Sequence, residues 1–122
     1  MKYVIMFTST PELDAAVPAE RAEQVYRQVY DWFGEHAEQI TDSGAELQPV
    51  STATTVTHGA EAPVVADGPF SEAKEVIGGF SVLDVDDLDA AIAIVKTWPM
   101  LQLPGTSVEI RPMVVDYSHM EQ

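Results

Sequence analysis

The stretch VIGGFSVLDVDDLDAAIAIVKTWP, residues 76–99, decides the fold of this chain. Its first ten residues are rich in β-branched and aromatic side chains, a composition that predicts a strand over 76–85. Asp86 and Asp87 follow with carboxylates suited to capping the start of a helix. The apolar residues after them recur at helical spacing, and Pro99 ends the helix. The stretch therefore predicts a strand that leads directly into a helix.

A similar pair of elements precedes this stretch. Residues 2–8 are apolar and predict a strand, and residues 9–17 predict a loop. From Pro18 onward, apolar residues recur at steps of three and four. Because proline suits the first turn of a helix and glycine suits its end, we expect one long helix of about seven turns that stops at Gly44.

The other extended segments are shorter. The sequence predicts extended pieces over 45–50 and 53–57, a returning strand over 63–66 and a last strand over 108–115. Residues 116–122 are polar and predict a loose tail. The order strand, helix, strands, strand, helix, strand predicts a ferredoxin-like split β-α-β arrangement of the α+β class, an antiparallel sheet with two helices on one face.

Both faces of this predicted sheet are apolar. Residues 3–7 are apolar at every position, Ile77 and Val85 share one parity of their strand, and Phe80 and Val82 take the other. A sheet with helices on one face is expected to be polar on its opposite face. The second apolar face needs a cover, and another copy of the chain supplies it most economically. We therefore expect a homodimer that packs sheet against sheet.

Composition and charge restrict the functions further. The length of 122 residues and an apolar fraction of 46% predict a single globular domain over 1–122. Twenty acidic residues against six basic ones give a net charge of −14, which disfavours nucleic acid and anionic lipid as partners. No apolar run reaches the roughly 18 residues of a membrane span, and the first ten residues read as a strand and not as a signal peptide. We expect a cytoplasmic protein.

The segment before the decisive stretch carries candidate catalytic residues. The run DGPFSEAKE, residues 67–75, begins with a tight turn because its proline restricts the backbone of its own position and of the preceding glycine. Asp67 and Lys74 form the first candidate pair, since a desolvated lysine beside a carboxylate can act as an acid or base. Alternatively, Asp67 caps its own turn and Lys74 pairs with Glu72 or Glu75.

A small organic ligand would need further groups. In so acidic a chain, Lys74 and Arg111 are the candidates for holding an anion, although Arg111 equally suits an ion pair with Glu109. Phe80 could line an apolar pocket, and the two glycines before it read as a bulge or a close approach of backbones. The predicted ligand-binding set is therefore Asp67, Lys74, Phe80 and Arg111.

The sequence predicts no metal site and no cofactor. The three histidines are His36, His58 and His119, and no two of them stand at the spacing of metal ligands. The chain has no cysteine, which excludes disulfides and thiolate ligands. His36 lies near the apolar stripe of the long helix, where a contact with the core is the simpler interpretation.

The run 67–75, together with Gly78-Gly79-Phe80, resembles the signature of the DGPF proteins in the YCII-related family. The resemblance extends to residues 84–91 and 108–112 and covers roughly residues 1–115. It implies a dimeric α/β barrel. The superfamily of such proteins includes muconolactone isomerases, small monooxygenases and a dechlorinating enzyme. DGPF proteins are also often encoded beside extracytoplasmic-function sigma factors.

The chain departs from the family pattern at one functional position. YCII proteins resemble enzymes that use a histidine and an aspartate, with the histidine early in the first helix, whereas residues 17–22 contain no histidine. The sequence therefore assigns no reaction. Two functions stay open: a protein that binds or transforms a small molecule in a cleft near the DGPF turn, and a non-catalytic accessory or regulatory protein, linked to a sigma factor and binding a basic partner.

Overall fold

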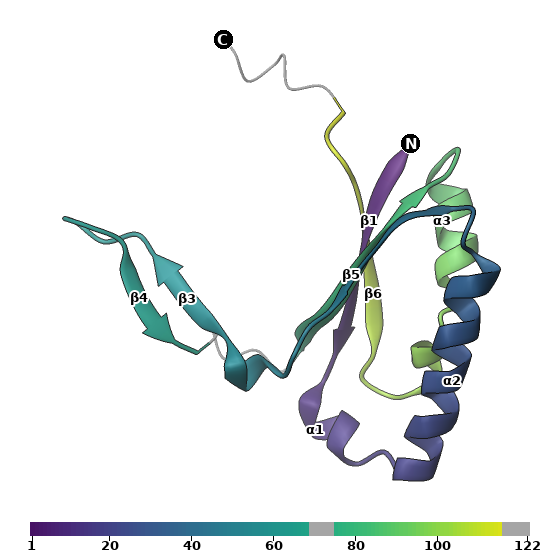
Figure 1. Cartoon of the computed structure of the whole chain (residues 1–122), viewed down its shortest axis with the longest axis horizontal. Helices are drawn as coiled ribbons and strands as arrows, with labels where there is room; N and C mark the ends of the chain where they lie inside the picture. Colours follow the sequence, from purple (N-terminus) through teal and green to yellow (C-terminus); the bar gives the residue numbers. More distant parts are fainter. Residues whose placement is uncertain (69–74, 116–122) are drawn as a thin grey trace.

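The structure, a computed structural model, describes residues 1–68 and 75–115, so that Lys74 and the predicted loose tail over 116–122 lie outside the described residues. The elements follow in the order β1 (Lys2–Ser9), α1 (Pro11–Ala15), α2 (Ala19–Glu35), β2 (Ile40–Glu46), η1 (Val50–Thr52), β3 (Thr54–Thr57), β4 (Val64–Asp67), β5 (Val76–Asp84), α3 (Leu88–Val95), η2 (Pro99–Gln102) and β6 (Ser107–Pro112). In Figure 1, α2 and α3 lie against one side of the main sheet, and the β3–β4 hairpin extends away from it.

The main sheet has the topology that the sequence predicts. Its strand order is β2-β5-β1-β6, and every pairing is antiparallel. In the inner strand β1, Ile5 lies opposite Ser81 of β5 on one side and opposite Ile110 of β6 on the other. This is the strand order of a ferredoxin-like fold, and the chain is an α+β protein of that kind.

The decisive stretch forms the elements expected of it. Val76–Asp84 is a strand and Leu88–Val95 is a helix. The Asp87 carboxylate accepts a hydrogen bond from the backbone N–H of Ala90 at 2.8 Å, which satisfies one of the free donors at the helix start. Of the two candidate caps, Asp87 is the one in the N-cap position.

The expected end of the long helix at Gly44 is wrong. α2 stops at Glu35, and His36 caps it with its N–H bonded to the carbonyl of Trp32. Ile40 continues the helical spacing in sequence, but it starts β2 and pairs with Leu83. Gly44 lies inside β2 with φ 68°, and a Cβ there would come within 1.8 Å of the Phe80 carbonyl oxygen. Gly44 therefore allows two strands to approach closely and does not end a helix.

The loop expected over residues 9–17 contains a short helix, α1. Pro11 occupies its first turn, where the missing N–H of proline costs nothing. Asp14 in the same turn suits the positive end of a helix dipole. In Figure 1, α1 lies at the lower end of the sheet, near the first turns of α2.

The core lies between the helices and the sheet. It consists mainly of buried aromatic and aliphatic side chains from β1, β5, α2 and α3: Tyr3, Ile5, Trp32, Leu83, Ala91, Val95 and Trp98. Ser81 is also fully buried, and its hydroxyl donates to the Ser43 carbonyl at 2.7 Å. The alternate residues of the same strands form the opposite face, where Val4, Met6 and Val82 are half-buried and Phe80 is 38% exposed. Both faces of the sheet are therefore apolar at its centre.

Candidate functional site

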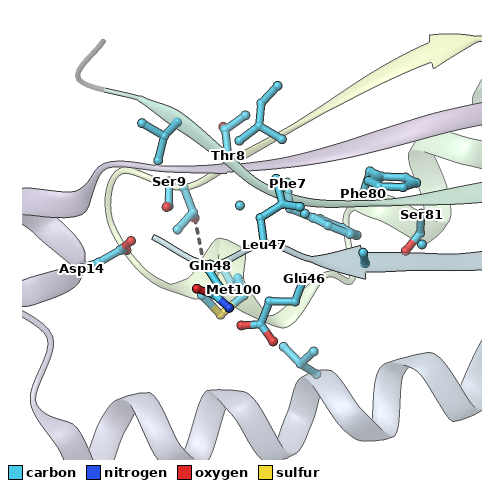
Figure 2. A pocket seen from close by; sticks show the side chains of 18 of the residues that line it. Phe7, Thr8, Ser9, Asp14, Glu46, Leu47, Gln48, Phe80, Ser81 and Met100 are labelled. Carbon is cyan, nitrogen blue, oxygen red and sulfur yellow. Dashed lines mark hydrogen bonds between the residues drawn. The ribbon is translucent and has the colours of Figure 1, made fainter. Parts of the chain in front are cut away.

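A cavity of about 810 Å³ lies between α2 and the end of the main sheet. Figure 2 shows it with α2 below and the strands above. The residues around it come from β1, α1, α2, β2 and β5, from residues 47–51 after β2, and from the segment between α3 and β6. The cavity therefore forms where the helix layer and the sheet diverge.

The inner wall of the cavity is aromatic. The rings of Phe7 and Trp98 stack with their centroids 4.1 Å apart, and the ring of Phe33 meets Trp98 edge-on at 5.8 Å. Val29 of α2 also packs against the core and lines the cavity. Stacked and edge-on contacts of this kind stabilise the positions of the rings. Such a wall suits an apolar molecule.

The polar groups at the rim come from three different elements. The hydroxyl of Tyr26 in α2 donates a hydrogen bond to the Glu46 carboxylate at the end of β2, at 2.9 Å. This hydrogen bond is the largest cause that raises the pKa of Tyr26, followed by partial burial and by the charges of Glu46 and Asp14. Asp14 reaches the rim from α1 (Figure 2). The rim therefore carries two carboxylates and a phenol that stays protonated.

Two glycines allow β2 and β5 to meet at the cavity. The pairing of β1 with β5 shifts between Phe7 and Thr8, so that Gly78 forms a bulge. A Cβ on Gly79 would lie 2.7 Å from the carbonyl oxygen of Ala45, a contact that only glycine avoids. The Leu47 N–H then donates to the Gly78 carbonyl at 2.7 Å. The expected bulge and close approach are both confirmed, and together they place the end of β2 at the cavity.

The predicted ligand-binding residues do not meet in one place. Phe80 belongs to the residues around the cavity, with its ring on the opposite side of β5 from Ser81 (Figure 2). Asp67 ends the β3–β4 hairpin, and Arg111 is an exposed residue of β6 that forms an ion pair with Glu109. Within residues 1–68 and 75–115, neither Asp67 nor Arg111 lines the cavity, and Lys74 lies outside those ranges.

Sequence reasoning missed the acidic rim. The helical stripe of α2 contains a signal for one member, because Tyr26, Val29 and Phe33 follow one another at steps of three and four and all line the cavity. Asp14 fell in a segment expected to be a loop. Glu46 ends β2, a strand with register shifts between Ile40 and Ala45 that no sequence pattern predicts.

Among the described hydrogen bonds and ion pairs, the contacts of His36 do not include a carboxylate group. The His36 ring packs against Trp32, with centroids 4.9 Å apart, and its Nε2 lies 3.4 Å from the Thr97 hydroxyl. Among the described residues, no three histidine, cysteine, aspartate or glutamate side chains stand close enough together to hold a metal ion. Over the same residues, no helix combines the length and apolarity needed to cross a membrane.

The fold and the cavity together define a ferredoxin-like α+β protein with a hollow between its helix layer and its sheet. The family model of the YCII-related domain matches residues 1–114, and the chain belongs to this family, as the DGPF signature predicted. The chain is also similar to an uncharacterised protein of Rhizobium meliloti (strain 1021), with 28% identity over 116 residues, which are 94% of each chain.

Proposed function

We propose that this protein binds a small, largely apolar organic molecule in the cavity between α2 and the sheet. The observation that supports this most directly is the cavity itself, about 810 Å³ with a stacked aromatic wall. Its volume falls in the range of about 300–1,000 Å³ that is usual for ligand pockets. A few polar groups at the rim, Tyr26 and Glu46 among them, are what a ligand needs for orientation.

We further propose that the working form is a homodimer packed sheet against sheet, in the manner of a dimeric α/β barrel. Val4, Met6, Phe80 and Val82 make the face opposite the helices apolar, and Phe80 is 38% exposed in the single chain. A second copy would cover this face. We also propose, from the sequence, that the protein is cytoplasmic.

The DGPF turn belongs to a second proposed site, because Asp67 and Arg111, both among the described residues, do not line the cavity. Asp67, Lys74, Phe80 and Arg111 are the candidate ligand-binding residues of this second site, and Asp67 and Lys74 are the candidate acid and base of any reaction there. Arg111 and Phe80 lie on strands of the face that the second copy would cover. In the dimer, therefore, they would lie at the interface, where two copies can contribute side chains to one site. No reaction is proposed.

Filling the cavity tests the proposed function. Val29→Trp replaces a small aliphatic side chain of the cavity wall with an indole ring. Tyr30→Trp places the same indole ring at the next position of α2, where the native side chain is 82% exposed. We expect naphthylmethanol, a neutral aromatic probe, to raise the melting temperature of the parent protein and of Tyr30→Trp, but not that of Val29→Trp. An equal response of both variants would show that the probe binds elsewhere.

A further inference from the structure

The charge of the cavity rim restricts the kind of ligand that fits. Asp14 is half-buried at the rim, and Glu46 lies beside Tyr26 at the end of β2. Among the described residues that line the cavity, none is a lysine, an arginine or a histidine. The hydroxyl groups and the amide there are neutral. The rim is therefore negative, and the wall behind it is apolar.

The two carboxylates are not neutralised by an ion pair in the part of the chain that the structure describes. The ion pairs found there join the N-terminus to Asp84, Arg27 to Glu23 and Arg111 to Glu109. Glu46 instead accepts a hydrogen bond from the neutral Tyr26 hydroxyl. One such bond leaves most of the acceptor capacity of a carboxylate for other donors.

The charges of both carboxylates act on Tyr26. Both Glu46 and Asp14 raise the pKa of its phenol through their charges, in addition to the hydrogen bond and burial. A group that senses both carboxylates lies near both of them. The negative charges of Glu46 and Asp14 repel a phenolate. The same charges would attract an ammonium group that lies near both carboxylates. The same cavity is lined by Phe7, Phe33 and Trp98, and cations are attracted to aromatic rings.

We propose that the ligand of this cavity is an organic amine with an apolar body, its ammonium group held by Asp14 and Glu46 and its body against Phe7, Phe33 and Trp98. The inference rests on the function proposed above. It differs from the anion-holding role that the sequence suggested for Lys74 and Arg111, because Arg111 pairs with Glu109 away from the cavity.

Three probes of one shape and different charge test the inference. Naphthylmethylamine, naphthylmethanol and naphthoic acid carry a positive charge, no charge and a negative charge at neutral pH. We expect calorimetric titration to show that affinity falls in the order amine, alcohol, acid. The amine should bind about fivefold more tightly than the alcohol, which is the upper range of the contribution of a solvent-exposed charge pair. The difference is expected to shrink as salt concentration rises.

Variants then locate the effect. Asp14→Asn and Glu46→Gln are each expected to lower the affinity for the amine about two- to fivefold more than the affinity for the alcohol. Glu61→Gln removes the same charge from the exposed segment between β3 and β4, and it is the matched control. Binding of the alcohol and an unchanged far-ultraviolet circular dichroism spectrum show that each variant keeps its fold and its cavity.

The outcomes separate the two proposals. If the acid binds as tightly as the amine or more tightly, the amine inference is wrong, while the cavity remains a ligand site. The acid arm includes Lys74→Ala, which would abolish acid binding if that lysine held the carboxylate. If none of the three probes binds, the proposed function itself fails, and the amine inference fails with it.

Discussion

Tyr26 has a pKa raised above its usual value, although the residue is 54% exposed. Its hydroxyl donates to Glu46, and this bond, burial and the charges of Glu46 and Asp14 all favour the protonated phenol. The folded pKa therefore lies above the unfolded value of about 10. The stability that this pair contributes is fully present below pH 10 and is lost as the pH rises through the higher folded value.

Ultraviolet titration of tyrosinate checks this. The difference between the parent protein and Tyr26→Phe gives the titration of Tyr26 alone, and we expect its midpoint above about 10. Tyr30→Phe is the control, because Tyr30 is 82% exposed on the same helix. Glu46→Gln is expected to lower the Tyr26 midpoint. A midpoint at or below the usual value would mean that the rim is not negative.

Single residues show what the sequence could and could not reveal. The glycine at 79 reads as a close backbone approach from its position in a strand, and the contact with Ala45 confirms this. Gly44 read as a helix end, because a glycine after a helical pattern usually is one. Its true reason, a backbone that passes against Phe80, depends on a residue 36 positions away. Contacts between residues so far apart cannot be predicted from the sequence around either residue.

The helix α3 depends on one cap. We expect Asp87→Ala to lower the free energy of unfolding by about 1 kcal/mol, since the first turn of α3 loses the hydrogen bond from Ala90 to the carboxylate. Asp86→Ala removes a neighbouring exposed carboxylate that is not the N-cap residue, and it is expected to change stability by less than about 0.5 kcal/mol. Urea unfolding measures both. Equal losses would show that charge, and not the cap, matters here.

The elements with strong periodicity were predictable, and the irregular ones were not. β1 and β5 follow from their runs of apolar, β-branched and aromatic residues, and α3 follows from helical spacing, a cap and a terminating proline. The end of α2 was misplaced because Ile40 fits the helical spacing equally well, and only its pairing with Leu83 decides otherwise. The cavity could not be predicted from the sequence either, because it also depends on contacts between residues far apart in the chain. It is lined in part by the irregular strand β2, whose register shifts no local sequence pattern specifies.

The outer face of the sheet governs the assembly of the proposed dimer. Phe80→Asp places a charge in the middle of that face, where a covered position would bury it without a partner. Sedimentation velocity at micromolar concentration is expected to show a dimer for the parent protein and a folded monomer for this variant. Tyr30→Asp, on the exposed side of α2, is expected to remain dimeric. A parent protein that is a stable monomer under these conditions would contradict the dimer.

Function depends most on whether the hollow between α2 and the sheet is a true binding site. Nuclear magnetic resonance with ¹⁵N-labelled protein and naphthylmethanol answers this directly, because every backbone amide and the Trp98 indole report separately. We expect saturable shifts at Phe7, Val29, Phe33 and Trp98, which line the cavity. No saturable shifts, or shifts confined to the β3–β4 hairpin, would contradict the cavity as the ligand site.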